Sequence, residues 1–415
     1  MKRFKISIFK FLIAVTPLYL LLSFAGLTQK MTEAEAVNTA LQQNQLIKSA
    51  EYQVDYFRQM KKTGSDMGNL SVVFMNGQYN TIEKDNNITL TQSIPFPGRI
   101  GAQMKLGEER INGSSKNVLV IKNNLVYDVK SSFEMLKHKN AYHKLLLSQD
   151  SLFSDFARAS TLRYKTGESN FLEMTTAKTQ LLEVKNMVWQ NEADIYILQK
   201  KLQALLKSDS PVDAASELSK RIFQDTSTSI KANPQLQYFQ QQVIISGQEK
   251  RVERNRLMPD FTVGYFNQSL IGYQNTTGQD AYYGKSYRFQ GFNAGITIPL
   301  WFAPQAARAK AASFQEESSR HSAEHFLTML NSDYEQALRE LDKHDASLIY
   351  YETSALKNAN LILSQARKAY QGGEIGYLEY LLSLKNAIAI KANYLQALSQ
   401  YNLAVVKVEF LTGQF

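Results

Sequence analysis

The distribution of proline constrains this 415-residue chain more than any other feature. Its eight prolines leave two long proline-free tracts of nearly equal length, 98–210 and 305–415. Proline inside a helix removes a backbone hydrogen bond and clashes with the preceding turn, so tracts without it can form very long helices. At ~1.5 Å per residue, a helix over residues 305–371 is about 100 Å long. The tracts therefore predict a rod-shaped, largely helical molecule.

Apolar residues in both tracts recur at steps of three and four, which is the spacing of packed helices. Many of these seam positions hold small or polar residues, so the pattern indicates long coiled coils without a thick leucine core. One predicted seam consists of Tyr334, Leu338, Leu341, Leu348, Ala355, Ala359, Ile362 and Ala366, and another of Ile195, Leu198, Leu202 and Leu205.

A similar motif interrupts each tract near its middle, at residues 164–173 and 370–379. Glycine ends helices in the left-handed conformation, so each motif predicts a hairpin tip between antiparallel helices. The offset of 206 predicts an internal duplication, with repeats at residues 26–207 and 233–415 and a linker at 208–232. The matching residues are Tyr164, Gly167, Glu168, Leu172 and Glu173 in the first tip and Tyr370, Gly373, Glu374, Leu378 and Glu379 in the second.

Sequence of β type precedes each tract. Apolar residues alternate with small or polar ones, a period-two pattern that predicts strands with two different faces. Ile94-Pro95 and Ile298-Pro299 repeat with an offset of 204, and the region is rich in Tyr and Phe. Alternating faces with aromatic belts are typical of outer-membrane β-barrels. The four expected strands are Leu70–Met75, Ile88–Ile94, Phe261–Gln268 and Tyr287–Ile298.

Four strands are too few to close a membrane barrel, since the smallest need about eight and lipid does not tolerate an open edge. If these strands lie in a membrane, at least two chains must share one barrel. The polar segments Asn80–Asn87 and Gly272–Ser286 are expected as loops at its outer end. The alternative is a small sheet packed on helices in a soluble protein.

The N-terminal segment 1–25 has the pattern of a cleaved secretory signal peptide. A head with four cations precedes an apolar run from Phe11 to Phe24, and Ser23 and Ala25 supply small residues at the cleavage site. The run is shorter than the ~20 residues that span a bilayer. Its removal reduces the net charge from +9 to +5, spread along the chain, which argues against nucleic-acid binding.

The chain has no cysteine, which excludes disulfides, cysteine-ligated metals, thiol catalysis and a lipid-anchoring cysteine. His321, Glu324 and His325 match the His-x-x-Glu-His zinc-protease pattern, for which Glu335 or Glu340 is a conceivable third ligand. The motif lies inside a coiled-coil tract with no globular domain to form a cleft, so we expect neither an enzyme nor a metal or cofactor site. The remaining histidines, which we expect on the solvated surface, are His138, His143 and His344.

Taken together, the doubled order of helix, two strands, long helix, tip and helix resembles the TolC-like outer-membrane efflux protein family. Asn233-Pro234-Gln235-Leu236 and Leu257-Met258-Pro259-Asp260-Phe261 are similar to segments of that family. The resemblance implies a homotrimer with a twelve-stranded barrel in the outer-membrane lipid and a twelve-helix α-barrel crossing the periplasm. The linker would belong to an equatorial belt, and the tips would form a gated entrance that meets a periplasmic adaptor and an inner-membrane pump.

The resemblance also implies roles for residues of the tips. Tyr370 matches a tyrosine that holds the tip closed, and Glu379 matches the first of two entrance aspartates. Leu382 stands where the second acid would be, and Ile375 replaces a latch arginine. Tyr164 and Glu173 are the gate counterparts in the first repeat, although the tip glutamates could simply solvate the hairpins. The expected adaptor contacts are Thr166, Gly167, Glu168, Gly372, Gly373 and Glu374.

The resulting expectation is a passive exit duct for small molecules or metal cations, driven by a pump of the resistance-nodulation-division type. A duct for type I protein secretion is the alternative within this class. A soluble periplasmic coiled-coil scaffold is the alternative from another class.

Overall fold

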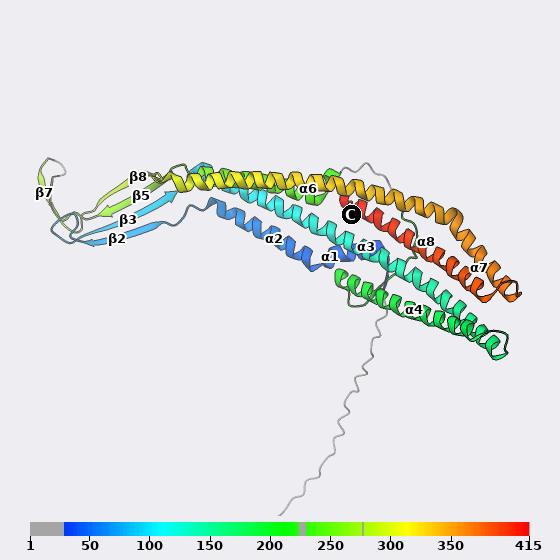
Figure 1. The fold of residues 1–415 in the computed structure, drawn as a ribbon. Coiled ribbons are helices and arrows are strands. Elements are labelled where there is room, and N and C mark those ends of the chain that lie inside the picture. The colour runs from blue at the N-terminus through cyan, green and yellow to red at the C-terminus, as the bar shows by residue number, and fades with distance from the viewer. Residues whose placement is uncertain (1–28, 224–229, 276–277, 415) are drawn as a thin grey trace, which may run out of the picture.

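The computed structural model describes residues 29–223, 230–275 and 278–414 of an elongated molecule (Figure 1). A β-sheet occupies one end, and two helical hairpins form tips at the other (Figure 1). The predicted signal peptide lies outside the described residues. Among these residues, no helix is both long and apolar enough to cross a bilayer.

The elements of the two halves follow the same order, as the sequence predicts. The first half contains β1 (Gln29–Met31), α1 (Glu33–Gln43), α2 (Gln45–Lys62), a 3-10 turn (Thr63–Ser65), β2 (Ser71–Gly77), β3 (Asp85–Ile94), α3 (Pro97–Lys165) and α4 (Phe171–Leu206). The second contains β4 (Val212–Ala214), a 3-10 turn (Ile230–Ala232), α5 (Pro234–Asn255), β5 (Asp260–Gln268), β6 (Gly272–Asn275), β7 (Asp280–Tyr283), β8 (Phe289–Thr297), α6 (Phe302–Tyr350), a π-turn (Tyr351–Ala355), α7 (Leu356–Gln371) and α8 (Tyr377–Thr412).

The four predicted strands form one antiparallel sheet in the order β2-β3-β5-β8. Strands β3 and β5 join the two repeats, with Ile94 opposite Phe261. Two predicted loops are shorter than expected. β3 already begins at Asp85, where it pairs with Gly77. The segment Gly272–Ser286 contains the hairpin β6–β7, in which Tyr273 packs edge-on against Tyr282.

Strand residues alternate between the two faces of the sheet. One face is mainly apolar, and the other carries more small and polar residues, although Val73, Met75, Phe266 and Phe289 also lie on it. The apolar face is exposed: Phe292 is 84% and Phe74 is 64% accessible. The cross-strand register places Val72, Phe74, Ile88, Leu90, Ile94, Phe261, Val263, Tyr265, Phe292, Ala294 and Ile296 on this face. The opposite face includes Thr89, Thr91, Ser93, Thr262, Gly264, Asn293 and Gly295.

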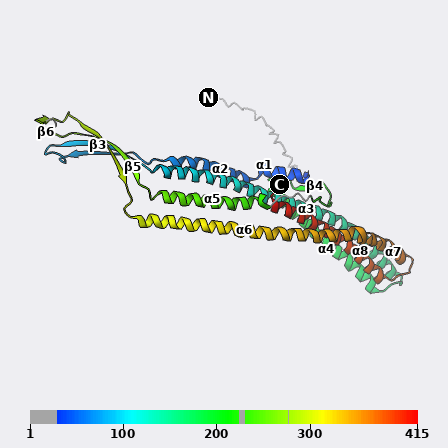
Figure 2. The same ribbon diagram turned by 90° about the horizontal axis from the view of Figure 1, so that it is seen from above.

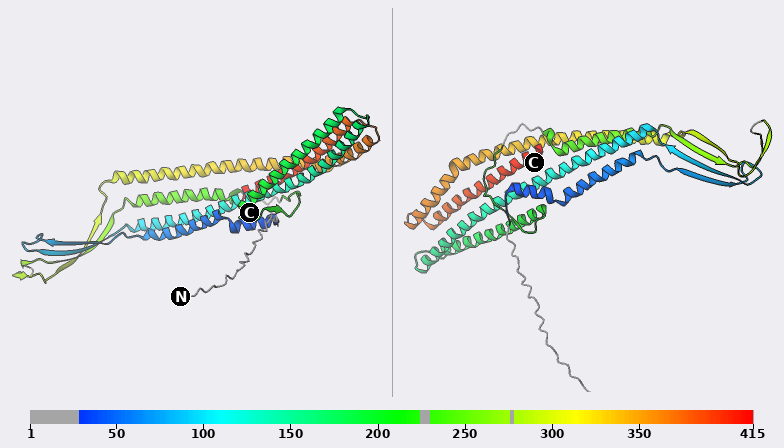
Figure 3. Two further views of the ribbon diagram at one scale, coloured as in Figure 1. Left: turned by 90° about the horizontal axis from the view of Figure 1, so that it is seen from below. Right: turned by 180° about the vertical axis from the view of Figure 1, so that it is seen from behind.

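The helices continue the order of the strands. α2, α3, α5 and α6 lie side by side as a wall that extends away from the sheet of β2, β3, β5 and β8 (Figure 2). Further from the sheet, α3 pairs with α4 and α7 pairs with α8, so that two hairpins lie together at the tip (Figure 3). The apolar core is divided into separate clusters along this rod. Both predicted seams contribute, with Leu202, Leu341 and Leu348 buried in them.

In each repeat, an asparagine caps the helix that precedes the first strand of the large sheet and ties it to the end of that repeat. Asn44 caps α2, and its Nδ2 donates to the Leu205 carbonyl at 3.3 Å. Asn233 caps α5, and its Nδ2 donates to the Leu411 carbonyl at 3.0 Å. The two carbonyls occupy equivalent positions near the ends of α4 and α8, which both have 36 residues. The duplication therefore extends to individual side-chain contacts.

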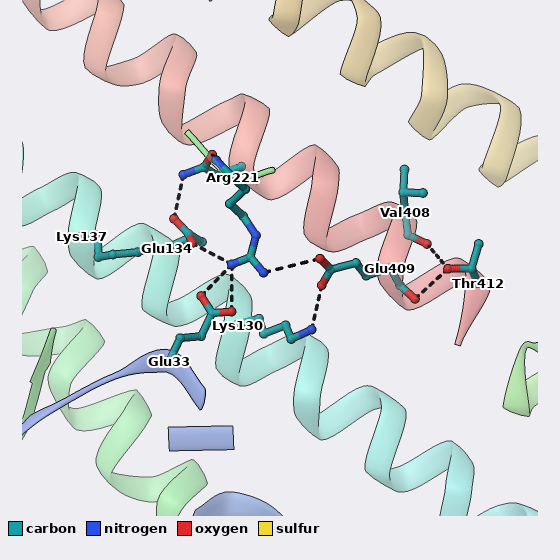
Figure 4. A network of polar contacts seen from close by, with 9 residues as sticks. Glu33, Lys130, Glu134, Lys137, Arg221, Val408, Glu409 and Thr412 are labelled. Atoms are coloured by element: carbon teal, nitrogen blue, oxygen red, sulfur yellow. Dashed lines mark hydrogen bonds and ion pairs between the residues drawn. The ribbon is translucent and has the colours of Figure 1, made fainter. Parts of the chain in front are cut away.

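The linker between the repeats crosses the middle of the rod. β4 pairs in parallel with β1, which fastens the linker to the N-terminal segment. Beyond it, Arg221 enters a cluster of charged residues from α1, α3 and α8 (Figure 4). Its Nη1 lies 2.7 Å from Glu33 and 2.9 Å from the fully buried Glu134, and its Nη2 lies 3.5 Å from Glu409.

Two lysines and an amide complete this cluster. Lys137 lies 2.6 Å from Glu134, and Lys130 lies 2.7 Å from Glu409. Asn402 donates to Glu134 at 3.0 Å and accepts from the backbone N–H of Arg221 at 3.0 Å. Three cations thus offset three carboxylates, as buried charges require. The cluster holds the linker against the helices and gives both hairpins a fixed base.

Candidate functional site

The two hairpin tips have nearly the same backbone, as the repeated motif predicts. The ends of α3 and α7, and likewise the starts of α4 and α8, fall at equivalent positions of the two repeats. Gly167 and Gly373 have positive φ angles of 80° and 75°, the left-handed conformation in which an L side chain is strained. In the first tip the Asn170 side chain accepts from the Glu173 N–H and caps α4, whereas Gly376 at the equivalent position has no side chain to do so.

Three side chains connect the two hairpins close to the tips. The Tyr370 hydroxyl of α7 donates to Glu173 Oε1 of α4 at 3.1 Å. Arg163 of α3 donates to the same hydroxyl at 3.1 Å, and its Nη1 lies 3.5 Å from Glu173. Glu173 is only 4% exposed, and these donors provide the hydrogen bonds that a buried carboxylate needs. We refer to Arg163, Glu173 and Tyr370 as the tip latch.

Aromatic packing fixes the ring of Tyr370 behind the latch. It stacks on Tyr380 of α8 with centroids 4.5 Å apart and an interplanar angle of 4°. Phe156 of α3 meets both rings edge-on, at 6.0 Å from Tyr370 and 5.7 Å from Tyr380. Residues of all four tip helices therefore form one apolar cluster, which positions the hydroxyl for Glu173.

The latch keeps Tyr370 and Arg163 in their usual charge states. Burial raises the pKa of Tyr370, with a further rise from Glu173, so the phenol stays a neutral donor. The bond to Tyr370, together with the nearby Glu173, raises the pKa of Arg163, so the guanidinium stays charged. A neutral donor and a fixed cation both face one carboxylate, and such charge-assisted hydrogen bonds are the stronger kind.

The latch uses the repeats asymmetrically. Of the four residues predicted for the gate, Tyr370 and Glu173 meet, while their counterparts Tyr164 and Glu379 are exposed. Tyr164 instead packs edge-on against Phe171 within its own tip, at 5.9 Å. The six predicted adaptor-contacting residues are exposed on the two turns: Thr166, Gly167, Glu168, Gly372, Gly373 and Glu374.

Sequence reasoning missed Arg163. The resemblance pointed to an arginine at position 375, where this chain has Ile375. The structure supplies a guanidinium from the first repeat, at a position whose counterpart is Ala369. No pattern in the sequence around Arg163 would have identified this role.

The zinc-protease pattern lies on an open helix surface. His321 and His325 are exposed on α6, and His321 Nδ1 lies 3.1 Å from Glu324 in the same helix. Over the described ranges, no three His, Asp or Glu side chains gather closely enough to bind a metal ion. His138 is half-buried rather than solvated, and burial lowers its pKa to about 4. It stacks on Tyr142, with centroids 6.3 Å apart.

No family model matches the chain, and no curated protein matches it in sequence. Solved structures share its fold over almost the whole length. A membrane protein from Pseudomonas aeruginosa aligns with a TM-score of 0.78 at 14% identity, over 93% of this chain and 91% of that one. The Campylobacter jejuni CmeC outer membrane channel aligns with a TM-score of 0.76 at 13% identity, over 92% of this chain and 86% of that one.

The outer membrane protein VceC from Vibrio cholerae gives a TM-score of 0.76 at 13% identity, over 92% of this chain and 96% of that one. At this identity the likeness concerns the fold, and it confirms the predicted arrangement of long helical hairpins joined to a short four-stranded segment.

Proposed function

We propose that this chain is one protomer of an outer-membrane exit duct whose entrance is closed by the tip latch. The observation that carries the proposal is the exposed apolar face of the four-stranded sheet, joined directly to a helical wall about 100 Å long. Such a face is stable in lipid but costly in water. Leu300 and Trp301, both over 80% exposed, lie where the sheet meets the helices and suit the lipid interface.

The open sheet supports a homotrimer. β2 and β8 are its two edge strands, and an unpaired edge is unstable in lipid. Three copies would pair β8 of one protomer with β2 of the next and give a barrel of twelve strands. α6 and α2 would meet in the same way and close the helical wall around a lumen.

The tip latch supports gating at the opposite end. A hydrogen bond to a charged group contributes about 1.5–3 kcal/mol, so loss of the Tyr370 hydroxyl would favour opening of each protomer by roughly tenfold or more. Because Arg163, Glu173 and Tyr370 belong to one chain, each protomer can hold its own tip closed without an arginine from a neighbour.

A duct that is closed and passive would need partner proteins that open it and supply the energy for transport. Since we assign no energy-coupling site to the described part of the chain, an inner-membrane pump of the resistance-nodulation-division type would drive transport. A periplasmic adaptor would contact the exposed turns at residues 166–168 and 372–374. The substrates would be small molecules or metal cations, for which Glu168, Glu374 and Glu379 place negative charge at the entrance. Type I protein secretion is the alternative cargo.

Membrane fractionation tests the proposal. The protein should fractionate with the outer membrane, require detergent, and migrate as a heat-sensitive trimer. Phe292→Arg on the apolar face should reduce trimer assembly, because a cation facing lipid costs about 2–4 kcal/mol. Ser93→Arg on the opposite face is the matched control and should assemble normally. A soluble wild-type monomer would refute the duct and support a periplasmic scaffold.

A further inference from the structure

The two long helices that descend from the sheet differ at one place. α3 is α-helical from Pro97 to Lys165, which is 69 residues. Its counterpart runs from Phe302 to Gln371, one residue longer, and contains the π-turn Tyr351–Ala355. A π-turn accommodates one additional residue within an α-helix. Figure 1 shows the long helix bending where α6 passes into α7.

The buried positions show that the additional residue lies in the π-turn. Before it, buried residues of the two helices correspond with an offset of 205, in the pairs Leu125/Leu330, Ser132/Ala337 and Leu136/Leu341. From its last residue onward, they correspond with an offset of 206, in the pairs Gln149/Ala355, Phe153/Ala359 and Ser160/Ala366. The insertion therefore leaves the packing on both sides in phase with the first repeat.

The π-turn is held on one side only. Ala355 is buried, and Tyr351 packs edge-on against Tyr394 of α8 at 6.4 Å. Glu352, Thr353 and Ser354 are exposed, and the Leu356 N–H bonds to the Tyr351 carbonyl five residues back. π-turns are places where long helices bend, and this one has little packing on its outer side to resist a change.

We propose that the π-turn Tyr351–Ala355 is the joint of the second hairpin, about which α7 turns relative to α6 when the tip opens, while α3 stays fixed. The proposal rests on the proposed function as a gated duct. If the additional residue moved out of the π-turn toward the tip, α7 would rotate by about 100° and advance by about 1.5 Å. That movement would take Tyr370 away from Glu173 and release the latch.

Hydrogen exchange on the wild-type protein tests the joint without any substitution. Amides 356–360, directly after the π-turn, should exchange at least tenfold faster than amides 150–154 at the equivalent place in α3. Equal or slower exchange would overturn the proposal. The measurement does not depend on conduction, so it separates failure of the joint from failure of the duct.

Spin-label distances between protomers test the movement. The native chain has no cysteine, so a label at Glu374→Cys reports the second tip alone, and Glu168→Cys reports the first as a control. With the latch removed by Arg163→Ala and Tyr370→Phe, distances at position 374 should change while those at 168 should not.

Deletion of Ser354 should make the second helix continuous and abolish that change, whereas Ser354→Ala, which keeps the length, should preserve it. Movement at 374 that persists after the deletion would contradict the joint. If the deletion prevents folding, the exchange comparison decides. Absence of any distance between protomers would contradict the trimeric duct instead.

Discussion

Replacement of Arg221 by methionine should destabilise the middle of the rod, because it removes the charge and retains much of the apolar stem. Glu134 would keep Lys137 and Asn402, and Glu409 would keep Lys130. Glu33, only 19% exposed, would lose both of its bonds to the guanidinium. Breaking a buried ion pair costs about 3–5 kcal/mol, and since one carboxylate of three is left unpaired we expect about 3 kcal/mol per protomer.

Thermal unfolding in detergent, followed by circular dichroism, measures this change. About 3 kcal/mol corresponds to a fall in midpoint of roughly 3–4 °C for a chain of this size. Lys220→Met is the matched control from the neighbouring position. Lys220 lies 2.5 Å from Asp345, but both side chains are over one-third exposed, so we expect less than about 1 kcal/mol.

The pH dependence sharpens the test. Burial raises the pKa of Glu33, against the opposing effect of Arg221. The relevant pH window lies between the pKa of Glu33 in the unfolded chain and its raised pKa in the folded protein. In this window the folded protein binds more protons than the unfolded chain, so stability increases as the pH falls. Loss of Arg221 raises that pKa further and widens the window. The stability that Arg221→Met loses relative to the wild type, which we call the deficit, should therefore shrink from pH 8 toward pH 5. A deficit below about 1 kcal/mol, or one that grows on acidification, would refute the reasoning.

Three further predictions concern other parts of the fold. Asn233→Ala removes a helix cap and a buried hydrogen bond to Leu411, so unfolding experiments should show a loss of stability of about 2 kcal/mol. Asn44→Ala, at a half-buried position, should cost about 1 kcal/mol, and equal losses would contradict the argument. Burial lowers the pKa of His138 to about 4 in the folded protein, so stability should fall by about 1–2 kcal/mol as the pH drops from 6.5 toward 4, after allowance for the partial exposure of the ring. His138→Gln should make the melting temperature less dependent on pH in this range. Gly373→Ala should cost about 1–2 kcal/mol in thermal unfolding because φ is 75°, whereas Gly376→Ala, at φ −77°, should cost nothing measurable.

Hydrophobic periodicity and the positions of glycine and proline predicted much of the architecture. The proline-free tracts became α3–α4 and α6–α8, and the motifs around Gly167 and Gly373 became the two turns, because glycine and proline act on the local backbone. The offsets of 204 and 206 differ by two residues, of which one lies before α6 begins and the other in the π-turn. The offsets do not give the position of the π-turn, because that position depends on which residues of the long helix are buried against α8.

Contacts between distant residues were harder to predict. The resemblance gave Tyr370 and Glu173, but Arg163 reaches them from another helix, and nothing in the sequence around it marks that role. Arg221 lies in an irregular linker without periodicity, and its three carboxylates come from positions 33, 134 and 409. Such clusters depend on tertiary packing, which local patterns do not encode.

Conductance of the purified protein in a planar bilayer tests the central claim of a duct closed by its own tip latch. The wild type should give small, cation-selective currents, and the double variant Arg163→Ala with Tyr370→Phe should give several-fold larger ones. Tyr164→Phe, which removes the exposed counterpart hydroxyl, should behave as the wild type. Trimers that carry no current in either form would contradict the duct, and equal currents in all three forms would contradict the latch.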